Sequence, residues 1–198
     1  KRPEYDYETG EVINPADFTC SYEKKENLLS VSEHFSLMNL LTSKTNGKQL
    51  DHQMINIWRI AKAFSNYYGA PYSVPTRLGL SGTPLNEALV CLHQILPQFQ
   101  KQNKLQKVQC IVLTDGEANH LSRHVEVKRH WESEPYMGCR QLSGGVTFLR
   151  DRKTGNTYNV PYGWHGFSDL MLQNLRDNFP SVNFVGIRVL EGRDCSSF

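Results

Sequence analysis

The sequence predicts an α/β fold in which a doubly wound, mainly parallel central sheet is flanked by helices and carries an inserted β-hairpin. An apolar run at residues 108–113 stops abruptly at Thr114-Asp115-Gly116-Glu117, as expected for a strand buried on both faces. Helical patterns and a second apolar strand pattern, at residues 182–190, follow in alternation. This alternation is typical of parallel sheets covered by helices.

Composition narrows the class of protein. The chain has 198 residues, a net charge of +2, 21% charged residues and 39% apolar residues. These values are ordinary for one globular domain, and the weak net charge argues against nucleic acid or an acidic membrane as partner. No apolar run approaches the roughly 18 residues of a membrane helix. We therefore expect a cytoplasmic protein with neither a nucleic-acid nor a membrane partner.

Cysteine usage agrees with this location. The five cysteines are Cys20, Cys91, Cys110, Cys139 and Cys195. Their number is odd and no CxxC pair occurs, so reduced thiols are expected rather than a disulfide framework.

The elements before the central strand are expected as follows. Residues 1–28 are polar and are interpreted as a surface insertion within a single domain of residues 1–198, whose first strand and helix would lie upstream of Lys1. Residues 33–41 predict a strand, with a helix as the alternative. Apolar stripes predict helices at residues 50–68 and 84–99, with Pro84 at the first position of the second helix and Pro97 bending or closing it.

The elements after the central strand are less uniform. A basic stretch at residues 121–131 predicts a short helix. Alternating runs around a Lys-Thr-Gly-Asn turn predict a β-hairpin within residues 144–162. Residues 167–179 show one apolar helical face, and residues 182–190 form the last expected strand.

Two loops stand out as a candidate site. Ser81-Gly82-Thr83-Pro84-Leu85 precedes the second helix, and Thr114-Asp115-Gly116-Glu117 follows the next strand. In a parallel sheet both loops fall at the same edge. A hydroxyl and carboxylates are hard oxygen donors that suit Mg²⁺ or Ca²⁺.

The segment "SGTPLNEAL", a helix with its link, and a strand ending "LTDGEAN" together resemble a von Willebrand factor A domain. The two loops then match the second and third loops of the metal-ion-dependent adhesion site of that family. The resemblance implies that Thr83 binds the metal directly and that Asp115 acts through water. Ser81 is a weaker metal candidate, and Glu117 would lie at the rim. The implied cofactor is Mg²⁺, with Ca²⁺ or Mn²⁺ as alternatives.

The first loop of that family, Asp-x-Ser-x-Ser, has no clear counterpart. Asp17-Phe18-Thr19-Cys20-Ser21 has a similar spacing, but the preceding GEVINPA is not a buried strand. We therefore expect the first strand and its motif upstream of Lys1.

The segments "NLLTSKTNGKQLDHQMINIWRIAKAF" and "GLSGTPLNEALVCLHQILPQFQ", with the polar insertion before them, also resemble the A-domain proteins of tailed bacteriophages. Those proteins are often similar to the A-domain subunits of metal chelatases and of other systems built with a MoxR-type AAA+ ATPase. The resemblance implies a binding module rather than an enzyme. Its partner would be a protein that offers a carboxylate, such as an AAA+ ATPase, and its location the host cytoplasm if it is phage-encoded.

Two alternatives stay open. A metal-dependent hydrolase or nuclease would use Asp115 and Glu117 together with His120 and His124, which are spaced to share one helix face. The other alternative is a structural protein with a degenerate metal site.

Overall fold

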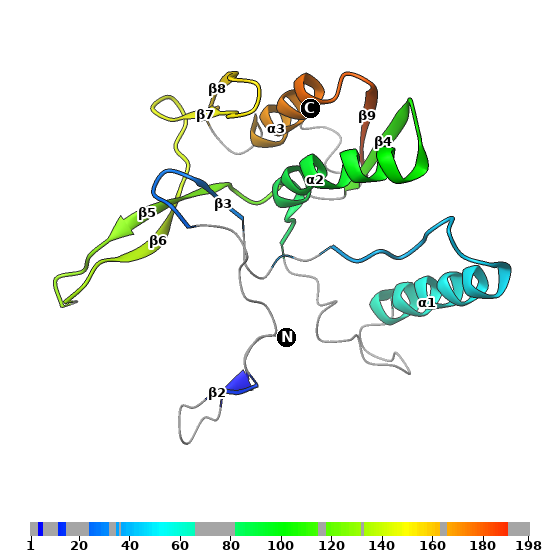
Figure 1. The fold of residues 1–198 in the computed structure, drawn as a ribbon. Coiled ribbons are helices and arrows are strands. Elements are labelled where there is room, and N and C mark those ends of the chain that lie inside the picture. The colour runs from blue at the N-terminus through cyan, green and yellow to red at the C-terminus, as the bar shows by residue number, and fades with distance from the viewer. Residues whose placement is uncertain are drawn as a thin grey trace. The chain divides into compact units, whose positions relative to one another are not determined.

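The computed structural model describes residues 4–5, 12–14, 24–31, 35, 37–65, 82–114, 118–131, 133–162 and 166–189. Within these ranges the chain is a mixed α/β protein with three helices and nine strands, labelled in Figure 1. It divides into two compact units. The first comprises Lys1–Thr19 and Ser36–Ser81, and the second comprises Cys20–Phe35 and Gly82–Phe198.

The first unit contains helix α1 (Gly47–Ser65) and the short antiparallel strands β1 (Glu4–Tyr5) and β2 (Val12–Asn14). The amides and side chains of Asn46 and Gln49 exchange hydrogen bonds of 3.0 and 3.1 Å. This capping box satisfies amides that the first helical turn leaves unpaired. The helix predicted at residues 50–68 is thus confirmed as far as Ser65, the last helical residue described.

The strand predicted at residues 33–41 is wrong for the part that the structure describes, residues 35 and 37–41, which are neither strand nor helix. The leucines and the methionine in this stretch are about half exposed. A short apolar run does not reveal whether a partner strand exists, and none of the described segments pairs with this one.

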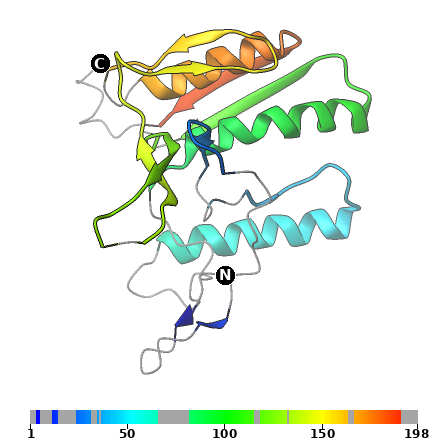
Figure 2. The same cartoon turned by 60° about the vertical axis from the view of Figure 1, so that its left-hand side comes forward.

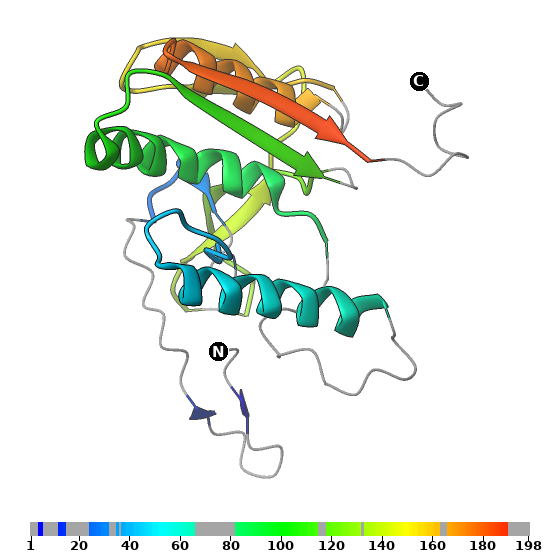
Figure 3. The same cartoon turned by 90° about the vertical axis from the view of Figure 1, so that its right-hand side faces the viewer.

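The second unit is built on two parallel strands, β4 (Val108–Thr114) and β9 (Val182–Arg188). Val108 lies opposite Val182, and Thr114 lies opposite Arg188. Helices α2 (Leu85–Asn103) and α3 (Gly166–Asn178) precede these strands in the chain (Figure 3). The predicted helix–strand alternation and parallel pairing are therefore observed.

Helices α2 and α3 pack together on one face of this pair of strands. Alternate residues of the strands, beginning with Val108 and Val182, face the helices. They join one hydrophobic core, whose buried members are Leu89, Leu96, Val108, Leu121, Leu142, Tyr158, Val160, Phe167, Leu170, Met171, Leu175, Phe179, Val182 and Phe184.

The opposite face of β4 is open. Ile111 is 61% exposed and Leu113 is 68% exposed, and Val185 and Ile187 lie beside them on β9. The prediction that β4 is buried on both faces is therefore wrong. Four consecutive apolar residues indicate strand structure, but they do not reveal whether both faces have a covering layer.

Pro97 lies inside α2, which continues to Asn103 before Lys104 ends it in the left-handed conformation, with φ 53°. Of the two outcomes expected of Pro97, bending or closing the helix, closure is wrong, because the helix continues beyond residue 99 to Asn103. A proline removes one backbone hydrogen bond, and the turns on either side keep theirs.

A three-stranded antiparallel sheet runs in the order β3 (Leu29–Ser30), β5 (Ser122–Val127) and β6 (Tyr136–Gln141). The short helix predicted at residues 121–131 is wrong, because β5 forms the middle strand of this sheet. Pairing with a strand on each side satisfies the backbone hydrogen bonds of β5. The local charge pattern of the sequence does not reveal that these partner strands exist.

The hairpin predicted within residues 144–162 is confirmed as β7 (Phe148–Arg150) paired with β8 (Thr157–Asn159). It lies along α3, as Figure 2 shows. Asp151, at the start of the turn, accepts hydrogen bonds from the side chains of Asn174 and Asn178 on α3. Tyr158 on β8 donates a 2.7 Å hydrogen bond to Asp177. Side-chain hydrogen bonds from the hairpin therefore also connect it to α3.

Hydrogen bonding controls the protonation of Asp151. Burial by itself raises its pKa, but the side-chain amides of Asn178 and Asn174 and the backbone amides of Lys153 and Thr154 outweigh that effect. The pKa of Asp151 therefore lies well below its usual range, and the hairpin turn carries a charged carboxylate at neutral pH.

Candidate functional site

The candidate site lies where β4 ends and α2 begins. Figure 3 shows the arrowhead of β4 and the first turn of α2 at the same end of the second unit. The carboxyl edge of a parallel sheet is where α/β proteins place their ligands. The sequence prediction that the loop before α2 and the loop after β4 meet at one edge is supported by direct hydrogen bonds between them.

Thr83 and Asn119 join the two loops. The backbone amide of Asn119 donates to the carbonyl of Thr83 at 2.8 Å, and the backbone amide of Thr83 donates to Asn119 Oδ1 at 3.3 Å. Both bonds use the backbone of Thr83, so its side-chain hydroxyl takes no part in this pairing. The half-buried Thr83 thus keeps an oxygen donor for a ligand at the loop junction.

Asn86, in the first turn of α2, supports this junction from inside the unit. It is fully buried, and its side-chain amide donates to the Asn119 carbonyl at 2.7 Å. Its Oδ1 accepts from the Ser168 hydroxyl on α3 at 3.1 Å. The loop after β4 is therefore anchored to both α2 and α3.

Gly82 permits the close approach of the loops. Its φ is +72°, a conformation that other residues adopt only with strain. A Cβ atom at this position would lie 3.1 Å from Asn119 Oδ1. Glycine therefore satisfies both the backbone conformation and the spacing to Asn119.

Glu87 is a buried carboxylate beside Asn86 in the sequence that the sequence analysis did not single out. It lies one residue after Asn86 and is 6% exposed, and its Oε2 atom makes no hydrogen bond within the described part of the chain. A glutamate at this helical position usually accepts from the N-cap amide, but the N-cap here is Pro84, which has no N–H. The sequence signal that could have revealed this position is the spacing Pro84-x-x-Glu87.

Glu87 lies in the first turn of α2, and its charge raises the pKa of nearby Cys91 on the same helix. A buried carboxylate oxygen without a partner is costly unless a cation or a donor reaches it. A carboxylate and the hydroxyl of Thr83 are hard oxygen donors of the kind that Mg²⁺ and Ca²⁺ bind.

The other predicted ligands lie outside the described residues. These are Ser81, Asp115, Glu117 and the Asp17–Ser21 stretch. Where the structure does describe the chain, no group of three or more His, Cys, Asp or Glu side chains is arranged to bind a metal ion. The described part of the site therefore consists of Thr83, Asn86 and Asn119, with the buried Glu87 next to Asn86 in the sequence.

His120 and His124 do not share a helix face, because the segment that carries His124 is strand β5. The His120 ring packs edge-on against Phe167, with centroids 6.0 Å apart. His124 lies opposite Cys139 on β6. The structure therefore removes the helical spacing on which a zinc site at these two histidines depended.

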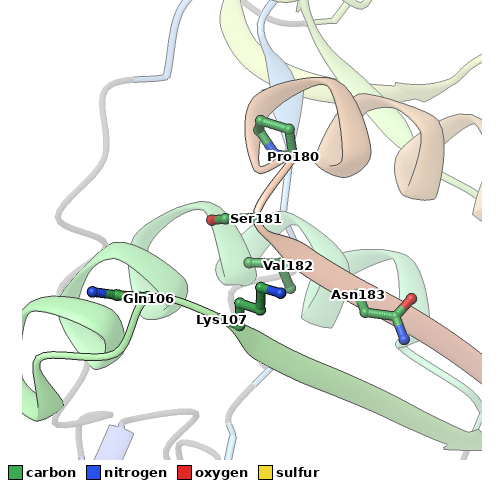
Figure 4. A pocket seen from close by; sticks show the side chains of 6 residues that line it. All are labelled: Gln106, Lys107, Pro180, Ser181, Val182 and Asn183. Atoms are coloured by element: carbon green, nitrogen blue, oxygen red, sulfur yellow. The ribbon is translucent and has the colours of Figure 1, made fainter.

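A separate pocket of 420 Å³ lies at the opposite, amino-terminal ends of β4 and β9 (Figure 4). Gln106 and Lys107 line it from the link before β4, and Pro180–Asn183 line it from the segment that enters β9. Its lining side chains include the positive charge of Lys107 and no carboxylate, which disfavours a cation site.

Comparisons with protein-family models, with curated proteins and with solved structures found no match to this chain. None of the helices in the described ranges has both the length and the apolar character required to span a membrane.

Proposed function

We propose that this protein is a metal-dependent protein-binding module of the von Willebrand factor A type. The observation that carries the proposal is the pairing of Thr83 with Asn119, which brings the loop before α2 to the loop after β4. Asp115 lies in the latter loop, one residue beyond the end of β4. Such a pairing is what a cation site shared by the two loops requires.

Thr83 and Asp115 would hold the cation, with Ser81 as a weaker candidate, and Glu87 would add a negative charge nearby. Mg²⁺ is the preferred ion, and Ca²⁺ or Mn²⁺ are alternatives. Magnesium tolerates few protein ligands and keeps waters, which suits a site with one hydroxyl and few carboxylates. When bound, the ion supplies an open coordination position that accepts a carboxylate from a partner.

A doubly wound sheet belongs to the same proposal. The parallel pair β4–β9 and the helices α2 and α3 on one face support it. The apolar residues on the other face, Ile111 and Leu113 among them, also support it, because parallel sheets are normally covered on both faces.

The proposed partner is a MoxR-type AAA+ ATPase that presents a carboxylate, in the cytoplasm. Binding of the purified ATPase to the full chain, in Mg²⁺ and then in EDTA, tests this function. We expect binding in Mg²⁺ that EDTA abolishes and that Thr83→Ala removes, while Thr83→Ser retains it because the hydroxyl remains. Binding that persists in EDTA would exclude the metal-dependent mechanism.

A further inference from the structure

A histidine, a cysteine and a serine meet on one face of the β3–β5–β6 sheet. His124 on β5 lies directly opposite Cys139 on β6. Cys139 Sγ is 3.8 Å from His124 Nδ1 and 3.1 Å from Ser30 Oγ on β3. Three neighbouring strands thus contribute one group each to a hydrogen-bonded row, separate from the Thr83 site.

The imidazole of this row is fixed in place. His124 is 2% exposed, and its backbone pairs with the segment before β3: its amide donates to Leu28, and its carbonyl accepts from Asn27. Cys139, in contrast, is exposed and carries a free thiol. The arrangement therefore places a rigid, buried base behind a nucleophile that a solvent-borne reagent can reach.

We propose that Cys139 is a reactive thiol that His124 deprotonates, and that it forms mixed disulfides with small disulfides. A thiolate is the attacking species in such reactions, and a neighbouring imidazole is a common means of producing it. In this row the thiol donates to Nδ1, which requires the proton of the neutral ring to be on Nε2. The Ser30 hydroxyl donates to the sulfur and stabilises its developing negative charge.

The reaction balances without any further reagent. The Sγ proton passes to His124 Nδ1, and Sγ attacks one sulfur of the small disulfide. A bond forms between these two sulfurs, and the original disulfide bond breaks. The departing thiolate leaves with the electron pair and takes the proton back from the imidazolium. Cys139 is oxidised to a disulfide sulfur, and half of the reagent is reduced to a thiol.

Charged neighbours lie around the row but not within it. Strand alternation places Glu126 on the same face, two residues from His124. Arg123 and Arg140 face each other across the strands on the opposite face. Within the described residues, the side chains that hydrogen-bond to the sulfur are His124 and Ser30, which makes them the variables to test.

The experiment measures the rate at which each thiol of the full chain reacts with 4,4′-dithiodipyridine at pH 7, with sites assigned by peptide mass spectrometry. Burial raises the pKa of both Cys91 and Cys110, and nearby Glu87 raises that of Cys91 further, so these thiols are slow internal references. We expect Cys139 to react about tenfold faster in the native chain than in the chain unfolded in urea. Exposure alone cannot produce a native rate above the unfolded rate.

Variants distinguish the effect of the His124 base on the Cys139 rate from the effect of solvent exposure alone. His124→Gln should lower the native Cys139 rate about tenfold, and Ser30→Ala should lower it by a smaller factor. The matched control is His93→Gln on α2, which should leave the rate unchanged. A native Cys139 rate no faster than the unfolded rate would overturn the proposal. A folded His124→Gln variant that keeps the full rate would also overturn it, and the native-to-unfolded comparison decides the matter if that variant does not fold.

Discussion

Two hydrogen bonds join Thr83 and Asn119: the backbone amide of Asn119 donates to the Thr83 carbonyl at 2.8 Å, and the backbone amide of Thr83 donates to the side-chain Oδ1 of Asn119 at 3.3 Å. These residues are 36 positions apart in the sequence. Their pairing connects the loop that carries the Thr83 hydroxyl with the loop that carries Asp115. The relative position of the two loops therefore depends on the residues that hold Asn119 in place.

Asn86→Ala should lower the free energy of unfolding by about 2–3 kcal/mol. The substitution leaves the Asn119 carbonyl and the Ser168 hydroxyl without their buried partner. Urea unfolding measures the loss. Asn103→Ala is the matched control, because the hydrogen bond from the Asn103 side chain to the Phe99 carbonyl, at the end of the same helix, is exposed to solvent, and it should cost less than about 0.5 kcal/mol. Equal losses in the two variants would contradict the anchoring role of Asn86.

Gly82→Ala should destabilise the chain more than Gly155→Ala. Both glycines have positive φ, +72° and +80°, so both variants carry a backbone strain of about 1 kcal/mol. Only the Cβ at position 82 meets Asn119, because nothing lies within 4 Å of a Cβ at position 155. The difference in urea midpoints reports the crowding at the loop junction. A larger loss for Gly155→Ala would show that the contact with Asn119 does not matter.

Asp151→Asn should lower stability at pH 7 by about 1–2 kcal/mol, because a charged acceptor of two side-chain amides becomes neutral. The folded-state pKa of Asp151 is depressed, so its contribution is complete above the unfolded pKa of about 4 and declines as the pH falls toward the folded pKa. The gap between wild type and variant should therefore narrow below about pH 4.

Urea unfolding between pH 2 and pH 7, which spans roughly the range over which carboxylates titrate, measures this gap. Asp169→Asn on α3 is the control, and as an exposed carboxylate it should change stability by less than about 1 kcal/mol. A gap for Asp151→Asn that widens in acid would contradict the account of the hairpin.

Leu175→Ala should cost about 2–5 kcal/mol, since Leu175 is fully buried between α3 and the core. Ile111→Ala, on the open face of β4, should cost less than about 1 kcal/mol. Thermal unfolding of both variants tests which face of β4 is covered in the isolated chain. A loss at Ile111 as large as that at Leu175 would show that both faces are buried.

The sequence predicted the elements whose pattern is long and periodic. The helices at α1, α2 and α3, the strands β4 and β9 and the β7–β8 hairpin all lie where their periodicity or turn residues place them. The prediction for the stretch that forms β5 was wrong for a physical reason. Its polar, basic residues fit an exposed helix as well as a strand, and pairing with β3 and β6 decides the outcome.

For the candidate site, the sequence predicted the juxtaposition of the two loops but not what holds them. The Thr83 loop was found because it precedes a helix, whereas Asn86 and Asn119 have no motif that marks their hydrogen bonds. Glu87 was missed because its significance comes from burial, which the sequence does not show. Cys139 and His124 meet only because β5 and β6 pair in one register.

The central claim is a divalent cation held between the loops of Thr83 and Asp115, and the paramagnetic effect of Mn²⁺ on backbone amide NMR signals tests it most directly. The account predicts saturable broadening of the Gly82, Thr83 and Asn119 amides that excess Mg²⁺ reverses. The amides of Val182 and Asn183, at the other end of the sheet, should be unaffected. Thr83→Ala should abolish the effect, and Thr83→Ser should keep it. Undisturbed amides at Thr83 and Asn119, or equal broadening in Thr83→Ala, would contradict the claim.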